Sequence, residues 1–224
     1  SDVSRKLAMI WNVYDFFTMY AEVDKYDSKD FKLENISNLK NPLDKWIVSR
    51  LWQLRDQITD GMEEYNLPKA LSDVLPFIDD LSNWFVRRSR RRFWKGEDDE
   101  DKKEAYDTLY YTLVYISKIL APFIPFLAEE LYLKMTDGNE SESVHLTIWP
   151  KTGKIDQIVL DNMSKLREII RDGLSLRMQK DENQPQIKVR QPLSQLIYNG
   201  DKLPDFYEKI IAEEVNVKKV EHGK

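Results

Sequence analysis

The sequence predicts a mainly α-helical protein, an antiparallel helical bundle followed by a small α/β segment. Only seven of its 224 residues are glycine, and apolar side chains recur at spacings of three and four residues over long stretches. Beyond Met178 short apolar runs typical of strands replace this spacing. Lys and Arg number 20 against 27 Asp and Glu through Pro150, but 14 against 12 after it. We therefore expect one domain over residues 1–150 and an appendage over 151–224.

The composition limits what the protein can do. With 42% hydrophobic and 33% charged residues it is typical of a globular chain, and the lack of cysteine excludes disulfides and thiolate zinc sites. Its two histidines, His145 and His222, are too few for a histidine metal cluster or a catalytic triad, so we expect no metal site. No apolar run approaches bilayer length and no signal peptide begins the chain. We expect a cytoplasmic monomer without a membrane partner.

The first helices have clear boundaries in the sequence. An apolar stripe rich in aromatic residues predicts a helix over residues 5–20, and a polar connection follows over residues 24–40. Asn41-Pro42 predicts the start of a second helix, which should reach about Tyr65, because asparagine caps helix N-termini and proline suits the first turn. Asn66-Leu67-Pro68 predicts the start of a third helix by the same device.

Prolines divide the later helices. The third helix is expected to continue through the arginine-rich stretch at residues 87–92 with a bend at Pro76, and a fourth, over residues 101–135, should kink at Pro122 and Pro125. The fourth helix carries the most apolar side chains and should lie at the centre of the core. The remaining predicted elements are a loop with an extended piece over 143–149, a helix over 155–178, strands over 187–189 and 193–198, a helix over 203–212 and a strand over 215–220.

One stretch opposes the charge of the rest of the chain. Although the formal net charge is -5, residues 87–95 hold five arginines, one lysine and no acid. A helix at about 100° per residue would turn one set of side chains toward the core: Ile78, Leu81, Phe85, Ser89 and Phe93. The opposite side would then present five candidate site residues to water: Asn83, Arg87, Arg90, Arg91 and Trp94.

The remaining side chains of this stretch should serve the fold. Arg88 and Arg92 lie nearer the apolar side, where we expect them to pair with acids, for example on a neighbouring helix. Trp84, Phe85 and Phe93 are expected to pack in the core.

The outward side chains favour a nucleic-acid partner. A charge run is often only a solvated helix face. Here, however, arginine is used almost to the exclusion of lysine, which favours bidentate and stacked recognition, and the row ends in an indole. Guanidinium groups can neutralise phosphates and an indole can stack an unpaired base.

Catalytic signatures are missing. The sequence has no glycine-rich phosphate loop, and its adjacent acid pairs, such as Glu63-Glu64 and Glu129-Glu130, point different ways on helices. No serine has a histidine partner that the sequence could nominate. We expect a binding protein without catalytic residues or a cofactor of its own.

Several blocks resemble the anticodon-binding helical bundle of class I aminoacyl-tRNA synthetases. In order, they are NPLDKWIVSRL at 41–51, NWFVRRSRRRFW at 83–94, LAPFIPFLAEELY at 120–132, SVHL with WP at 143–150, and IKVRQPL at 187–193 with AEEVNVK at 212–218. The second block closely matches the version in isoleucyl-tRNA synthetases, and the last is similar to the segment that follows in isoleucine enzymes. The resemblance covers nearly the whole chain.

This resemblance implies a longer parent that attaches isoleucine to its tRNA using ATP and Mg²⁺. The His-x-Gly-His motif and the Lys-Met-Ser-Lys-Ser loop of the family are absent, so we expect an inactive C-terminal region. Its partners would be isoleucine-accepting tRNA and the catalytic core of its own parent chain. Arg87, Arg90 and Arg91 would contact phosphates or base edges, Trp94 would stack an anticodon base, and Asn83 would read a base edge.

Two alternatives stay open. Valyl and leucyl enzymes share the helical bundle, so the amino acid could differ. A helical protein-interaction bundle could also use the arginine row to bind an acidic partner protein.

Overall fold

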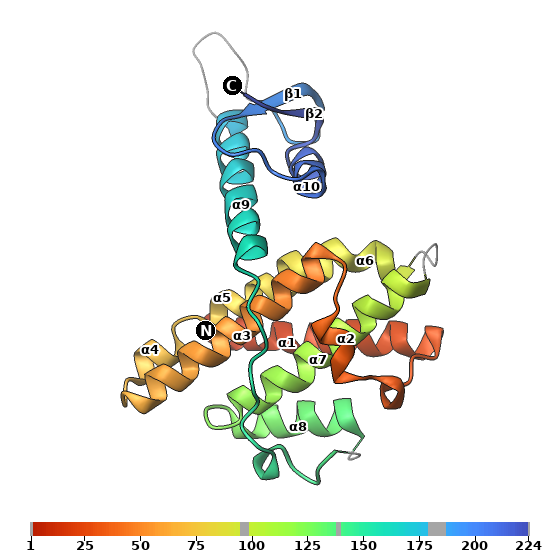
Figure 1. Cartoon of the computed structure of the whole chain (residues 1–224), viewed down its shortest axis with the longest axis vertical. Helices are drawn as coiled ribbons and strands as arrows, with labels where there is room; N and C mark the ends of the chain where they lie inside the picture. The colour runs from red at the N-terminus through yellow and green to blue at the C-terminus, as the bar shows by residue number, and fades with distance from the viewer. Residues whose placement is uncertain (1, 95–98, 138–139, 179–186, 224) are drawn as a thin grey trace. The chain divides into compact units, whose positions relative to one another are not determined.

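The computed structural model describes residues 2–94, 99–137, 140–178 and 187–223 (Figure 1). The chain divides into two compact units, Ser1–Asp156 and Gln157–Lys224. Whether these units are the two domains expected from the sequence stays a prediction. The first unit is helical, and the second combines two helices with a pair of strands. The predicted fold class, a helical bundle with a small α/β segment, is confirmed.

The first unit is a bundle of helices (Figure 1). Its elements are α1 (Asp2–Asp24), the 3₁₀ turn η1 (Ser28–Asp30), α2 (Leu33–Ser37), α3 (Pro42–Glu63), α4 (Leu67–Leu71), α5 (Val74–Asp79), the π-helical η2 (Asp80–Val86), α6 (Arg87–Trp94), α7 (Asp99–Leu120), α8 (Pro125–Thr136) and the 3₁₀ turn η3 (Val144–Leu146). Among the described residues, no helix is long and apolar enough to span a membrane.

Asparagine caps start α3 and α4 as predicted. The side chain of Asn41 accepts a hydrogen bond from the backbone N–H of Leu43, and that of Asn66 accepts one from Lys69. Each cap satisfies an N–H that has no partner within its helix, and a proline occupies the first turn of both helices.

The prediction of one continuous third helix, bent at Pro76, is wrong. It is broken between α4 and α5, and the π-helical η2 lies between α5 and α6. The ring of Pro76 would clash with the carbonyl of Ser72 in a continuous helix, so the break comes before the proline rather than at it. Arg50 of α3 forms ion pairs with this segment: its Nε lies 3.1 Å from Asp80, and an Nη lies 2.9 Å from Asp73.

Three further predictions need correction. Pro122 and Pro125 do not merely kink the fourth helix, because α7 ends at Leu120 and α8 starts anew and packs against α7. The polar connection contains the short helix α2, which buries Ile36, and the expected extended piece over 143–149 contains the turn η3. Helix α2 packs against α7, and η3 packs against α8 and α7. The local sequence does not reveal these contacts.

The core of the first unit is centred on α7. From Ala105 to Leu120 nearly every side chain of this helix is buried, and α1, α2, α3, α6 and α8 all pack against it. The deepest large side chains include Trp46, Phe77, Phe85, Phe93 and Tyr132. Because α6 contributes Phe93 and η2 contributes Phe85, the arginine stretch is held firmly along one side.

The second unit contains α9 (Gln157–Met178), β1 (Leu193–Tyr198), α10 (Asp205–Val215) and β2 (Val217–His222). The strands β1 and β2 are parallel, with Leu193 opposite Val217 and Tyr198 opposite His222. Helix α10 packs against α9 and lies in the connection between the strands, because parallel strands require a crossover. The strand predicted at 187–189 is wrong, since those residues have no partner strand and lead into a turn.

Candidate nucleic-acid interface

All five predicted site residues lie on η2 and α6 and point away from the core. Asn83, Arg87, Arg90 and Arg91 are exposed, and Trp94 is 76% exposed. The core-facing set is buried as predicted: Ile78, Leu81, Phe85, Ser89 and Phe93. One helical stretch therefore separates a buried apolar side from a cationic and aromatic surface, which we call the arginine face and define as Asn83, Arg87, Arg90, Arg91 and Trp94.

Arg87 has a fixed position on this face. Its Nε donates a 2.7 Å hydrogen bond to the backbone carbonyl of Asn83, and its guanidinium carbon lies 5.6 Å from the centre of the Trp84 ring. The Asn83 amide in turn donates to Asp79 at 2.8 Å, and Lys6 of α1 donates to the same carboxylate oxygen. These contacts hold the N-terminal end of the arginine face and reduce the side-chain freedom that binding would remove.

Arg90 and Arg91 differ from Arg87, because they have no partner among the residues that the structure describes. Across the described ranges of the chain, neither makes a hydrogen bond or an ion pair, and both are exposed. Arginine keeps its charge at any physiological pH. These two guanidinium groups can therefore meet an external anion without first breaking a bond inside the protein.

Arg92 behaves in the opposite way. Its two Nη atoms donate to the Asp44 carboxylate of α3 at 2.9 and 2.6 Å, and its Nε donates to Asp101 of α7 at 2.8 Å. The predicted pairing with acids of neighbouring helices is thus confirmed for Arg92, whose side chain is only 10% exposed. Burial raises the pKa of the Asp44 carboxyl to about 7, and the Arg92 hydrogen bonds oppose that rise.

Trp84 is the residue that the sequence misjudged. The expected core packing is right for Phe85 and Phe93 but wrong for Trp84, which is half-buried and carries the Arg87 guanidinium over its ring. Its position on the flank between the buried and exposed sides, three residues before Arg87, was the available signal.

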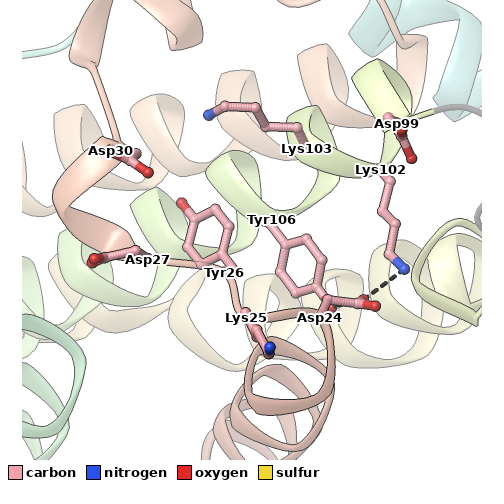
Figure 2. A pocket seen from close by; sticks show the side chains of 9 residues that line it. All are labelled: Asp24, Lys25, Tyr26, Asp27, Asp30, Asp99, Lys102, Lys103 and Tyr106. Atoms are coloured by element: carbon pink, nitrogen blue, oxygen red, sulfur yellow. Dashed lines mark hydrogen bonds and ion pairs between the residues drawn. The ribbon is translucent and has the colours of Figure 1, made fainter.

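A polar cavity of 290 Å³ lies between the end of α1, the turn η1 and the start of α7. Figure 2 shows Tyr26 and Tyr106 with their rings side by side; the ring centres are 4.9 Å apart and nearly parallel. Lys102 pairs with Asp24 at 2.6 Å, and Lys103 pairs with Asp107 at 3.0 Å.

The cavity therefore differs from the arginine face in charge. Four aspartates line it together with three lysines, and two of those lysines already have carboxylate partners. Such a balance does not favour binding of a phosphate. The two tyrosine hydroxyls are also occupied, since Tyr26 donates to Asp107 and Tyr106 donates to Asp24. Burial and these carboxylates raise the pKa of both phenols.

A second cavity, of 390 Å³, is apolar. Aromatic side chains of α7 and the segment after η3 line it, among them Tyr110, Tyr111 and Trp149. At its edge Lys118 pairs with Glu140 at 3.0 Å. Lys151 also lines it and is exposed, but the rest of the lining is mainly apolar and aromatic, which does not favour a polyanion.

Within the described residues no cluster of three or more His, Cys, Asp or Glu could hold a metal ion. Glu129 belongs to the adjacent acid pair Glu129-Glu130. It accepts hydrogen bonds from the Ser143 hydroxyl and the Val144 N–H, so it fixes the turn η3. His145 is exposed and its backbone N–H bonds to Ser143.

Known proteins that resemble this chain belong to one family. Residues 44–195 match the family model described as the anticodon-binding domain of tRNA ligase. The isoleucine–tRNA ligase of Clostridium acetobutylicum is 43% identical over 229 residues, covering 100% of this chain and 21% of that protein. The enzyme of Clostridium novyi is 42% identical over 97% of this chain and 21% of its own length, and that of Chlamydia pneumoniae is 40% identical over 96% and 20%. The chain thus spans about a fifth of the length of these relatives.

Proposed function

The chain belongs to the family of anticodon-binding domains of tRNA ligases, and from this membership we propose that it binds the anticodon stem-loop of isoleucine-accepting tRNA. The observation that carries the proposal is the exposure of all five residues of the arginine face along a helix whose other side is buried. In a chain with a formal net charge of -5, affinity for a polyanion must come from such a local surface.

Each residue of the arginine face has a proposed role. Arg90 and Arg91 contact phosphates or base edges, and Arg87 does so from its fixed position beside Trp84. Trp94 stacks an unpaired anticodon base, which contributes about 1–3 kcal/mol. Asn83 lies at the far end of the face and reads a base edge through its amide.

The proposal extends to a longer protein. Because the relatives are about five times as long as this chain, we propose that it is part of an isoleucine–tRNA ligase whose catalytic core joins isoleucine to tRNA with ATP and Mg²⁺ in the cytoplasm. In that protein, which we propose to be a monomer, the arginine face would help to select the tRNA that the catalytic core then charges. The valyl and leucyl alternatives are disfavoured, since the relatives that support the proposal are isoleucine enzymes.

Equilibrium binding to tRNA transcripts tests the proposal. The 224-residue chain is titrated with isoleucine tRNA and with valine tRNA at about 50 and 200 mM salt, because binding that releases counterions weakens steeply over that range. The isoleucine tRNA should bind more tightly, and an Arg87→Ala, Arg90→Ala double variant should lower both the affinity and the salt slope. Arg171→Ala is the matched control, since Arg171 is 71% exposed on α9 of the second unit.

Two results would contradict the proposal. One is a lack of tRNA binding at low salt, and the other is an equal loss of affinity in the control and in the double variant. Binding of an acidic protein that competes with tRNA would favour the alternative of a protein-interaction bundle. Binding of both tRNAs with equal affinity would remove the claim of isoleucine specificity.

A further inference from the structure

The indole of Trp84 is the least explained large side chain of the arginine stretch. Phe85 and Phe93 are essentially inaccessible, at 0% and 1% exposure, whereas Trp84 is half-buried between the core side and the arginine face. Over its ring, 5.6 Å from the ring centre, lies the guanidinium carbon of Arg87. The Arg87 cation thus lies over the indole at the surface of η2 and α6.

We propose that Trp84 and Arg87 together form a second stacking site for an unpaired RNA base, separate from Trp94. This inference rests on the proposed function and deepens it, because it states which form of RNA the surface takes. Bases stack on aromatic rings and equally on the plane of an arginine guanidinium group. The exposed Arg87 group, supported from beneath by the indole, offers such a plane at the surface.

The site is held in place before any ligand arrives. The Arg87 Nε is tied to the Asn83 carbonyl at 2.7 Å, and the Asn83 side chain is tied to Asp79 at 2.8 Å. The backbone beneath it is the π-helical η2, anchored to α3 through the Asp80–Arg50 ion pair. Single π-helical turns are rare and occur often at functional sites. A site ordered in advance loses little entropy when it binds.

The distance between the two indoles determines whether a single-stranded loop or a duplex can bind at both. Trp84 and Trp94 are ten residues apart along helical backbone, which corresponds to about 15 Å. Neighbouring bases of one nucleic-acid strand rise by only about 3.4 Å. Two bases bound at Trp84 and Trp94 are therefore not neighbours in one stack. The ligand must present two separated, unpaired bases, as a single-stranded loop does and a duplex does not.

The RNA between these two bases passes over the cationic part of the face. Arg90 and Arg91 lie between Trp84 and Trp94 in the sequence and are exposed. Their guanidinium groups can neutralise the phosphates that link the two splayed bases. The surface thus combines two stacking sites with an electrostatic connection, which is the arrangement expected for single-stranded recognition.

Fluorescent stem-loop RNA tests the inference with the full 224-residue chain. An anticodon stem-loop carries 2-aminopurine at one loop position at a time, and its fluorescence and binding are measured with the wild type, Trp84→Met and Trp94→Ala. Methionine is apolar and flexible and occupies part of the space of the half-buried indole, but it has no flat ring. We expect Trp84→Met to weaken binding by between about fivefold and a hundredfold, the range for the loss of one stacked base. It should also relieve quenching at one loop position, and Trp94→Ala should relieve it at another.

Matched variants separate stacking from folding. Trp84→Phe should recover most of the affinity, because it restores a flat ring. Trp149→Met changes another half-buried tryptophan, on the apolar cavity, and should leave RNA binding unchanged. A fully paired RNA of the same length should bind the wild type and Trp84→Met with equal affinity, since it offers no unpaired base.

The possible results distinguish the two proposals. If Trp94→Ala weakens binding but Trp84→Met binds like the wild type, the second stacking site is refuted and the proposed function stands. Relief of quenching at the same loop position by both variants would also refute it. If the wild type binds neither the stem-loop nor tRNA, the proposed function fails and the inference fails with it.

Discussion

Arg92 and its neighbours Arg90 and Arg91 belong to the same eight-residue helix, yet the structure uses them in opposite ways. Arg92 is 10% exposed and holds Asp44 and Asp101, so it connects α6 with α3 and α7. Arg90 and Arg91 are exposed and, among the described residues, have no acid partner. The number of arginines in a stretch therefore does not measure its capacity to bind anions. What matters is whether each guanidinium group already has its carboxylate.

Stability should depend on the buried arginine more than on any exposed one. In Arg92→Ala the Asp44 carboxylate, which is fully buried, loses both of its Arg92 hydrogen bonds. Removing one partner of a buried ion pair costs about 3–5 kcal/mol. We expect a loss of this size in the free energy of unfolding, measured by urea denaturation.

Arg90→Ala is the control for this prediction. Arg90 lies two residues away on the exposed side, where substitutions usually change stability by less than about 0.5 kcal/mol. Equal stability of the two variants would show that the buried network does not support the fold, and the contrast between the two kinds of arginine would be lost.

Alkaline pH should destabilise the fold through buried tyrosines, while the charge of the arginine face stays unchanged. Burial raises the pKa of Tyr110 and of Tyr132 from 10 to about 12. The folded state therefore holds these protons more tightly, so their contribution is complete below pH 10 and is lost as the pH rises toward 12. Each phenol should cost about 1.4 kcal/mol of stability per pH unit in that window.

Denaturant titrations at several alkaline pH values measure this loss. Arginine stays charged over the whole range, so the arginine face should keep its charge until the protein unfolds. Stability that already falls steeply below pH 10 would mean that groups with a lower pKa than these two tyrosines control alkaline unfolding.

The two sides of α6 show which structural features the sequence alone could predict. Apolar spacing is a local property, so it predicted both sides of the arginine stretch and the caps at Asn41 and Asn66. The π-helical η2 could not be predicted, because it depends on Arg50, which is 30 residues away along the chain from Asp80. The choice of Asp44 as the partner of Arg92 depends on packing between α3 and α6 in the same way.

The same distinction applies to the candidate site, where local spacing could be predicted and long-range packing could not. The exposed residues of the arginine face could be named from helical spacing, although their contact with RNA stays a prediction. The flank position of Trp84 was a signal in the helical spacing, but its exposure is decided by how closely neighbouring helices approach it, which the sequence does not give. The two cavities combine side chains that lie far apart in the chain, such as Asp24 with Tyr106 and Phe31 with Trp149, and no local pattern marks them.

Binding should depend on the exposed indole while stability does not. Trp94 is 76% exposed, so Trp94→Ala should leave the unfolding transition almost unchanged. Loss of a stacked base should weaken binding of the anticodon stem-loop by about 1–3 kcal/mol. Fluorescence anisotropy with labelled stem-loop RNA measures this change. Phe126→Ala, at a 90% exposed aromatic residue of α8, is the control, and an equal loss there would indicate a nonspecific aromatic effect.

The smallest effect is expected at the lysines of the polar cavity in Figure 2, where cations are present but already paired. Lys102 is bound to Asp24 and Lys103 to Asp107, so both charges are cancelled within the protein. Lys102→Ala and Lys103→Ala should therefore leave the affinity for tRNA within about twofold and the salt slope unchanged, because no phosphate contact is removed. Thermal melts of both variants establish that they fold. A fall of about 0.7 in the salt slope for either variant would mean that the ion pair opens to bind a phosphate, and pairing inside the protein would then no longer separate structural cations from binding ones.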